Sequence, residues 1–265
     1  MENKDIKLAI FDIDDTLIKR GKITIEESAK HAIKKLQEKG IEVMIATGRA
    51  FYFIHDDIHE SVSPNYYVST NGACVYDKDL NLVFKVAMDL DEVNQIVNYA
   101  RENNLGIALK EEKNMPVYND LNVFQTIYMQ GSNKLDILED HTQDNKTITK
   151  DVMGLFVMGD EDLILGAKKF TDDTFAHAYH QAYDIYSKDA GKIKGIEHVL
   201  EDLGLNWSNV ISFGDAANDA EMIEKSAIGV AMGNSIDSLK EIADYVTSDI
   251  TDDGVFNALT HLKLI

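Results

Sequence analysis

The stretch IKLAIFDIDDTLI, residues 6–18, decides the fold class of this chain. It opens with an apolar run, Ile6 to Phe11, and continues directly into three carboxylates, Asp12, Asp14 and Asp15. Apolar runs in which polar residues do not alternate with apolar ones are typical of strands buried on both faces, as in parallel sheets. Carboxylates this close repel one another unless a positive group lies among them. The stretch therefore predicts a buried strand that ends at a charged site.

The segments that follow alternate between helical and strand patterns. Residues 24–40 have helical apolar spacing, a capping-box signature at Thr24 and Glu27, and a glycine at the end. Residues 41–48 and 66–69 are two further apolar runs. This order of strand, helix, strand, helix, strand predicts an α/β domain with a parallel sheet.

A second pattern interrupts the first. A hairpin is predicted over residues 73–86, then a helix over 89–104 and strands over 105–109, 123–130 and 153–159. The first pattern returns after residue 187, with helices at 194–204 and 219–225 and strands at 209–214 and 228–232. We expect a doubly wound, Rossmann-like parallel-sheet core formed by residues 1–85 and 187–265, with an inserted α+β domain at 86–186.

Composition excludes several classes of partner. The 265 residues carry a formal net charge of −20, which repels nucleic-acid phosphates and anionic membrane surfaces. No apolar stretch reaches the roughly 18 residues of a membrane helix, and the N-terminus lacks the apolar core of a secretion signal. The single cysteine, Cys74, cannot form an internal disulfide. These features favour a cytoplasmic protein with a small-molecule partner.

Four short segments follow predicted strands or begin predicted helices, at the sheet edge where α/β proteins bind ligands. They are DIDDT (12–16), ATGR (46–49), GKIKG (191–195) and GDAAND (214–219). Aspartates from two adjacent strand ends would form an oxygen-rich site suited to Mg²⁺. A hydroxyl beside a glycine, and a lysine at a helix start, would hold an anion there. Together these groups predict phosphoryl transfer.

The four segments resemble the signature of the haloacid dehalogenase superfamily of phosphatases. The start DIDDTL and the endings GDAANDAEMIE, VAMGNS and TSDITDDGV resemble the Cof-type branch in particular. The resemblance covers residues 6–84 and 188–260, whereas the middle module matches only in position and rough pattern. It implies a Mg²⁺-dependent phosphatase with an aspartyl-phosphate intermediate, in which the inserted domain is a mobile cap. We expect its substrate to be a small phosphorylated metabolite, with sugar phosphates as the first candidates.

The resemblance also implies roles for particular residues. Asp12 would be the nucleophile, and Asp14 would protonate the leaving group and then activate water. Thr47, Gly48 and Lys194 would hold the phosphoryl group, and Lys194 is preferred to Lys192 because it directly precedes a glycine and the predicted helix.

The metal ligands implied by the resemblance are Asp12, the backbone carbonyl of Asp14, and Asp215. Asn218 and Asp219 would support the ion or reach it through water. Position 15 is often glycine in this family, and we interpret Asp15 as a turn residue.

Several alternatives stay open at the level of sequence. Arg49 would either touch the substrate or hold a carboxylate, and Asn71 would either contact substrate or form a turn. A phosphomutase or phosphotransferase could use the same core, and a catalytically inactive metabolite-binding regulator is a further alternative. The sequence determines neither the substrate, nor the cap residues that select it, nor the oligomeric state.

Overall fold

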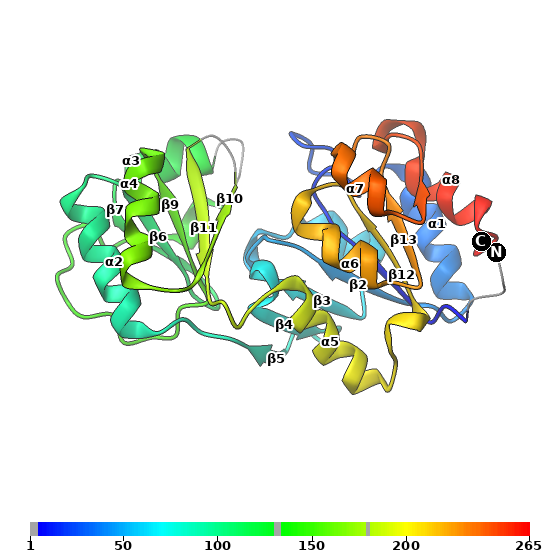
Figure 1. Ribbon diagram of the computed structural model, residues 1–265, viewed down its shortest axis with the longest axis horizontal. Coiled ribbons are helices and arrows are strands. Elements are labelled where there is room, and N and C mark those ends of the chain that lie inside the picture. The colour runs from blue at the N-terminus through cyan, green and yellow to red at the C-terminus, as the bar shows by residue number, and fades with distance from the viewer. Residues whose placement is uncertain (1–4, 130–133, 179–180) are drawn as a thin grey trace. The chain divides into compact units, whose positions relative to one another are not determined.

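The computed structural model describes residues 5–129, 134–178 and 181–265. It separates into two compact units (Figure 1). The core unit comprises Met1–Arg49, Ile54–Phe84 and Lys192–Ile265, and the inserted unit comprises Ala50–Phe53 and Lys85–Gly191. The predicted boundaries, 85/86 and 186/187, lie close to the observed 84/85 and 191/192. The short segment Ala50–Phe53 was not expected in the inserted unit.

An eight-stranded sheet forms the centre of the core unit, in the order β14-β13-β12-β1-β2-β3-β4-β5. Neighbouring strands from β14 through β3 are parallel, whereas β3 and β4 pair antiparallel. The prediction of a parallel α/β core is confirmed. The strands are β1 (Leu8–Phe11), β2 (Glu42–Ala46), β3 (Tyr66–Ser69), β4 (Cys74–Asp77), β5 (Leu82–Lys85), β12 (Val210–Gly214), β13 (Ile228–Ala231) and β14 (Tyr245–Val246).

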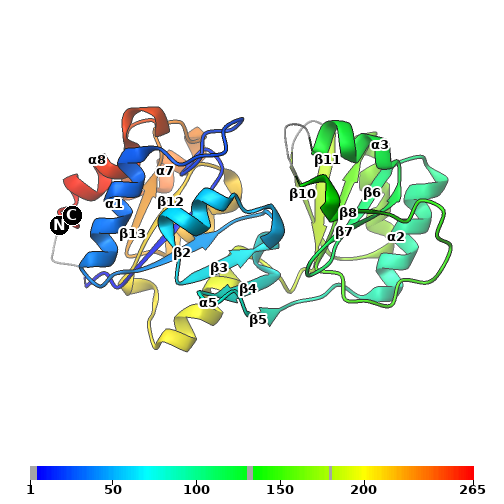
Figure 2. The same ribbon diagram turned by 180° about the vertical axis from the view of Figure 1, so that it is seen from behind.

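Helices cover both faces of this sheet, as Figures 1 and 2 show. On one face, β1 and β2 contribute Leu8, Ile10 and Met44 to a buried cluster with α5 and α6. On the other face, α1 packs against α8 and β2. Burial on both faces explains why β1 reads as a continuous apolar run. The helices are α1 (Glu27–Glu38), α5 (Lys192–Leu203), α6 (Ala220–Lys225), α7 (Asp237–Ile242) and α8 (Gly254–His261).

The start of α5 is held close to the sheet by a glycine. A Cβ atom at Gly195 would lie 2.7 Å from Cγ1 of Val68 on β3 and 3.4 Å from the backbone of Gly72. Only a residue without a side chain fits there, and Ile196, Val199 and Leu200 of the same helix are buried. The helix start is thereby fixed beside the carboxyl edge of the sheet.

The inserted unit has its own mostly antiparallel sheet, in the order β10-β11-β9-β6-β7-β8. Helix α2 (Leu90–Glu102) packs on one face through Val93, Ile96 and Val97. The predicted helix at 89–104 and the strands at 105–109 and 153–159 are confirmed as α2, β6 and β9. The remaining elements are β6 (Gly106–Lys110), β7 (Met115–Asn119), α3 (Leu121–Val123), β8 (Leu138–Asp140), β9 (Gly154–Met158), α4 (Glu161–Leu165), β10 (Thr174–His177) and β11 (Ala182–Tyr186).

The predicted strand at 123–130 is wrong; its last residue, 130, lies outside the described part of the chain. Residues 121–128 are helical, first as α3 and then as the π-helical turn η4 (Phe124–Tyr128). Asp120 has a left-handed backbone (φ 54°), and its side chain accepts a hydrogen bond from the Val123 N–H. This N-cap starts a helix, and it overrides the strand-like composition of residues 123–130.

The segment Ala50–Phe53 packs within the inserted unit. Ala50 and Phe53 belong to a buried cluster with Phe124 and Phe156, and the ring of Phe53 lies 5.5 Å from that of Tyr128. The amino group of Lys134 donates to the carbonyl of Tyr52. The chain therefore enters this unit briefly, directly after Arg49.

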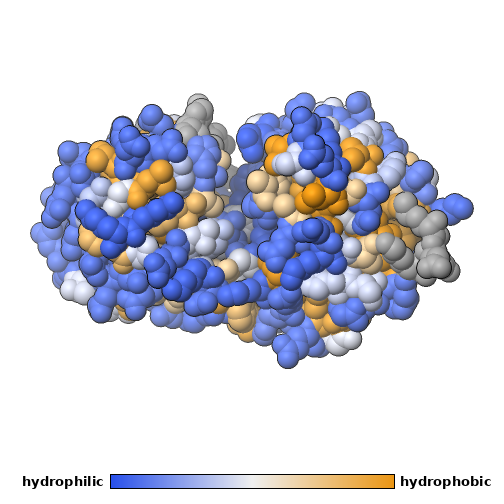
Figure 3. Space-filling model, viewed as in Figure 1, coloured by the Kyte–Doolittle hydropathy of each residue, from blue (hydrophilic) through white to orange (hydrophobic). Residues whose placement is uncertain are grey.

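Hydrophilic side chains dominate the face drawn in Figure 3, and apolar residues occur there in small groups. This distribution agrees with the strong excess of acidic residues. Among the described helices, none has the length and apolarity needed to cross a membrane.

Candidate active site

Three neighbouring strands bring the predicted site residues to one edge of the core sheet. Asp12 follows β1, Asp215 follows β12 and Thr47 follows β2, and these strands are adjacent in the order β12-β1-β2. Carboxylate oxygens of Asp12, Asp215 and Asp219 lie within 4.8 Å of one another. The convergence predicted from the strand ends is therefore present in the structure.

The lysine at this edge is Lys192, and the prediction of Lys194 does not agree with the structure. The Lys192 Nζ donates to Asp12 Oδ1 and to Asp219 Oδ1, at 2.7 Å in each case. Helix α5 begins at Lys192, two residues earlier than expected, so Lys192 is its first residue and Lys194 its third. Lys192 is buried, whereas Lys194 is exposed.

Asp219 links the lysine to the loop after β12. Its second oxygen, Oδ2, accepts hydrogen bonds from the backbone N–H groups of Asp215 and Ala216, both at 3.1 Å. A Cβ at Gly214 would lie 2.5 Å from the Asp219 Cβ, so the glycine makes room for this side chain. Both oxygens of Asp219 are engaged by the protein, which suits a residue that orients Lys192 and the loop of Asp215.

Crowding at this edge shifts the ionisation of its groups. Burial raises the pKa of the Asp12 carboxyl well above its usual range; Lys192 opposes this shift, and Asp219 and Asp14 add to it. Burial, together with the charges of Asp219 and Asp15, raises the pKa of Asp215 to about 7. Burial alone would lower the pKa of Lys192, but Asp12 and Asp219 raise it above its usual value. Lys192 therefore stays charged between two carboxylates.

The donor set fits a divalent metal ion with a preference for oxygen ligands. Asp12 and Asp215 present carboxylates whose charges are penalised by burial, and an added cation would reverse that penalty. No softer ligand, cysteine or histidine, joins the acidic cluster found in the described residues. Hard oxygen donors of this kind suit Mg²⁺.

Asp14 forms a two-point ion pair with Arg49. Arg49 donates from Nε to Oδ2 at 2.8 Å and from an Nη to Oδ1 at 2.7 Å. Burial would raise the pKa of Asp14, but the hydrogen bonds and charge of Arg49 bring it below its usual value. Of the two roles left open for Arg49, the structure shows the contact with a carboxylate.

Thr47 and Gly48 follow β2, and both contact Asn71, which lies in the turn after β3. The Thr47 hydroxyl accepts a hydrogen bond from the Arg49 N–H at 3.2 Å, so its own hydrogen can be donated to another group. A Cβ at Gly48 would lie 2.8 Å from Oδ1 of Asn71. Gly48 is therefore needed for the Asn71 side chain, in addition to the anion approach that the sequence suggested.

The remaining predicted residues take different positions. Asn71 is buried in a left-handed turn (φ 51°), and its N–H donates to the Thr47 carbonyl. Asp15 is also left-handed (φ 57°), and its side chain accepts from the Arg20 N–H, so its interpretation as a turn residue is correct. Asn218 is exposed beside the cluster.

Sequence reasoning missed two features of the site. From the sequence alone, Lys194 is preferred to Lys192 because Lys194 directly precedes the glycine. A pattern in which the lysine is the first residue of the helix, with the glycine three residues later, would have selected Lys192. Asn234 was not considered, although its amide donates to the Asp15 carbonyl and accepts from the Ile250 N–H. It joins the loop after β1 to two later loops.

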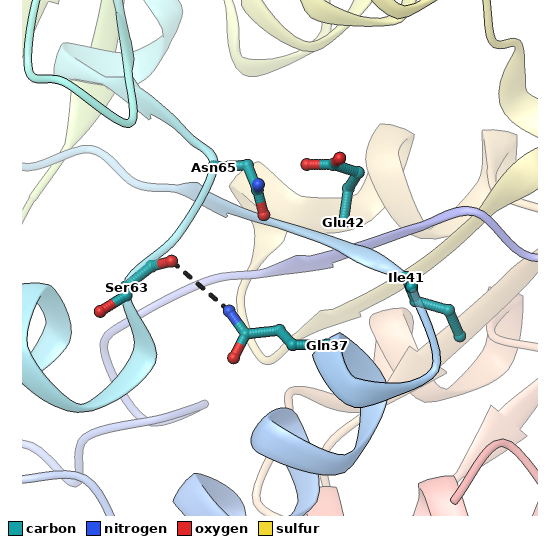
Figure 4. Close-up of a pocket in the computed structure, with 6 residues that line it drawn as sticks. Gln37, Ile41, Glu42, Ser63 and Asn65 are labelled. Carbon is teal, nitrogen blue, oxygen red and sulfur yellow. Dashed lines mark hydrogen bonds between the residues drawn. The ribbon is translucent and has the colours of Figure 1, made fainter.

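A separate hollow lies at the opposite edge of the core sheet (Figure 4). It measures about 180 Å³ and is lined by Gln37, Gly40, Ile41, Glu42, Ser63 and Asn65. The amide side chains that line it make structural hydrogen bonds to the backbone. Gln37 donates to the Val62 carbonyl, and Asn65 accepts from the Val43 N–H. This hollow brings together no set of catalytic groups.

Comparison with known proteins agrees with this geometry. The sequence model of the haloacid dehalogenase-like hydrolases matches residues 9–259. The chain belongs to this family. The Cof-type resemblance and the parallel-sheet fold are thereby confirmed.

Two curated relatives are named as phosphatases. YkrA of Bacillus subtilis is 30% identical over 263 residues, which cover 98% of this chain and 99% of the relative. A protein of Streptococcus pyogenes named as a bifunctional phosphatase/peptidyl-prolyl cis-trans isomerase is 31% identical over 268 residues. The match covers 99% of this chain but only 55% of that relative, so the chain spans about half of its length.

The solved structure of the subclass IIB sugar phosphatase BT4131 superposes with a TM-score of 0.82 and 26% identity. The match covers 98% of this chain and 100% of that chain. This structural match and the two named relatives together place the chain among the phosphatases of the haloacid dehalogenase-like family, as the sequence predicted.

Proposed function

We propose that this chain is a Mg²⁺-dependent phosphatase that hydrolyses small phosphorylated metabolites, chiefly sugar phosphates, through an aspartyl-phosphate on Asp12. The observation that supports it most is the position of Asp12. Its carboxylate is buried at the carboxyl edge, 2.7 Å from the Lys192 ammonium and close to Asp215. A carboxylate held beside a fixed cation suits a nucleophile that must attack an anionic phosphoryl group.

In the first half of the reaction, an Asp12 oxygen forms a bond to phosphorus while the bond from phosphorus to the leaving oxygen breaks. The charge of the bound phosphoryl group would raise the pKa of Asp14, against the effect of Arg49. Asp14, once protonated, gives its proton to the leaving oxygen, which departs as an alcohol. Lys192 balances the charge of the phosphoryl oxygens, and the Thr47 hydroxyl donates a hydrogen bond to one of them.

In the second half, water attacks phosphorus and the bond to Asp12 breaks, so that inorganic phosphate is released. Asp14, now a carboxylate, takes the proton of the attacking water. Asp12 and Asp215 would hold Mg²⁺ with the Asp14 carbonyl, and Asp219 would orient the loop. When bound, the ion would supply charge neutralisation at this edge.

The substrate class rests on similarity and on the surface charge. BT4131 is named as a sugar phosphatase, and a chain with a net charge of −20 is poorly suited to nucleic acids. We further propose that the inserted unit is the specificity cap. The single, buried Cys74 supports a cytoplasmic location.

A panel of phosphorylated metabolites, assayed for released inorganic phosphate with Mg²⁺ and again with EDTA, tests the proposal. We expect hydrolysis of one or more sugar phosphates with Mg²⁺, loss of activity in EDTA, and recovery when Mg²⁺ is restored. Full activity in exhaustively chelated enzyme would refute the role of the metal. Isomerised phosphosugar without phosphate release would instead indicate a mutase.

A further inference from the structure

The turn that follows β3 has an uncommon backbone. Thr70 and Asn71, the first two residues of η3 (Thr70–Gly72), are buried and left-handed, with φ angles of 50° and 51°. This conformation costs free energy in a residue with a side chain, most of all in a β-branched one such as threonine. Among the residues that the structure describes, no other two neighbouring non-glycine residues share it. The contacts of the turn must therefore hold it in place.

The left-handed turn directs two successive backbone N–H groups to the loop after β2. The Thr70 N–H donates to the Arg49 carbonyl at 2.7 Å, and the Asn71 N–H donates to the Thr47 carbonyl at 3.2 Å. In an extended strand, successive N–H groups point to opposite sides, so a straight continuation of β3 could not form both bonds. The Arg49 N–H in turn donates to the Thr47 hydroxyl at 3.2 Å. The strained turn thus holds the segment that carries this hydroxyl.

The turn also packs closely against its neighbours. Oδ1 of Asn71 lies so near Gly48 that a Cβ there would be 2.8 Å away from it. Gly72, the last residue of the turn, lies against α5, because a Cβ at Gly195 would be 3.4 Å from the Gly72 Cα and carbonyl oxygen. The turn therefore contacts both the loop after β2 and the helix that begins with Lys192.

We propose that Asn71 is a positioning residue: its left-handed backbone fixes Thr47, and it acts on the reaction through the Thr47 hydroxyl. This inference deepens the proposed function and rests on it. The Thr47 N–H donates to the Val68 carbonyl of β3 at 2.8 Å, so with the bond from Asn71 both backbone polar groups of Thr47 are held. A group displaced by about 1 Å loses much of its effect on a reacting atom. Positioning of Thr47 therefore accounts for a strained turn at this place in the fold.

Two substitutions at position 71 separate backbone geometry from side-chain contact. Glycine adopts the left-handed conformation freely, whereas alanine does so only at a cost in free energy. We expect Asn71→Ala to lower kcat/KM about ten- to a hundredfold for the phosphate ester that the wild type hydrolyses fastest. Asn71→Gly, which lacks the amide but keeps the turn, should restore kcat/KM to within about threefold of wild type. An amide that touched the substrate would be lost equally in both variants.

Asn104→Ala is the matched control. Asn104 is also a left-handed asparagine, with a φ angle of 54°, but it is exposed and lies after α2 in the inserted unit. The variant places alanine in the same strained conformation away from the site. It should change kcat/KM by no more than about twofold. Thermal melting of each variant identifies any loss of folding, so that a kinetic effect can be told from a loss of stability.

A double-mutant cycle tests whether Asn71 acts through Thr47. In a Thr47→Ala background, Asn71→Ala should change kcat/KM by no more than about twofold, because the hydroxyl that it positions is already absent. Equal losses in Asn71→Gly and Asn71→Ala would overturn the proposal, since they would show that the amide itself is required. A loss that recurs in full in the Thr47→Ala background, or unchanged kcat/KM in Asn71→Ala, would overturn it as well. If the wild type releases no phosphate from any ester, the proposed function fails and this inference fails with it, before any variant is made.

Discussion

At the scale of single residues, Lys192 is the point on which the site depends most. Its ammonium lies between Asp12 and Asp219, 2.7 Å from each, and all three residues are buried. Removing one partner of a buried ion pair leaves an uncompensated charge. Here two carboxylates would lose their common cation, so Lys192 should matter both for the reaction and for the fold.

We expect Lys192→Ala to lower kcat/KM by about ten- to a thousandfold. A charge-assisted contact contributes about 1.5–3 kcal/mol, and more in a site that excludes water. The same change should lower the free energy of unfolding by about 3–5 kcal/mol. Steady-state kinetics and urea unfolding measure the two effects. Lys194→Ala is the control: Lys194 is two residues away and exposed, and the variant should stay within a few-fold of wild type. The reverse ranking would contradict the placement of Lys192.

At the scale of elements, the position of α5 determines where Lys192 lies. Gly→Ala inside a helix ordinarily stabilises it by about 0.5–1 kcal/mol. At Gly195 the new methyl group would lie 2.7 Å from the Val68 side chain, so α5 would have to move away from β3. We therefore expect Gly195→Ala to destabilise the core unit by about 1–3 kcal/mol and to reduce kcat/KM by displacing Lys192. Glu201→Ala, an exposed change in the same helix, should do neither.

The beginning of α1 shows why some local predictions failed. The sequence predicted a capping box at Thr24 and Glu27, but the N-cap is Glu26 and no side chain caps the helix there. Instead, Asp57 accepts a hydrogen bond from the Ile25 N–H at 2.8 Å and pairs with Lys30 at 3.0 Å. An acceptor 32 residues away cannot be inferred from the local pattern.

Asp57 also gives a pH-dependent prediction. Burial alone would raise the pKa of Asp57, but its bonds to Ser61, the Ile25 N–H and Lys30 lower it below its ordinary value. The folded state therefore binds this proton less readily than the unfolded state. The stabilisation is present above the ordinary pKa of about 4 and disappears as the pH falls through the lowered value. Asp57→Asn should cost about 1 kcal/mol at pH 7.

Urea unfolding followed by the fluorescence of Trp207, the one tryptophan, measures this effect in the core unit. The difference between Asp57→Asn and wild type should shrink toward zero at pH 3. A difference that is the same at pH 3 and pH 7 would show that the charge of Asp57 contributes nothing.

At the scale of the whole molecule, the features set by long apolar runs could be predicted from the sequence. The run before Asp12 and the run before Asp215 each had to be buried strands, and parallel strands bring their carboxyl ends to one edge. Features set by tertiary contacts could not be predicted in this way. The pairing of Arg49 with Asp14, the helical turn after Asp120 and the inclusion of Ala50–Phe53 in the inserted unit depend on residues far apart or on a single left-handed position.

The central claim is that Asp12 carries the phosphoryl group during turnover, and trapping that intermediate tests it most directly. Enzyme mixed with p-nitrophenyl phosphate and Mg²⁺ is quenched in acid and reduced with borohydride, which converts an aspartyl-phosphate to homoserine. Peptide mass spectrometry then locates the modified residue. We expect homoserine at position 12 in the wild type, none in Asp12→Asn, and more in Asp14→Asn, because breakdown of the intermediate needs Asp14 as a base. Homoserine at position 14 or 215, or phosphate release with no modified residue, would contradict the account.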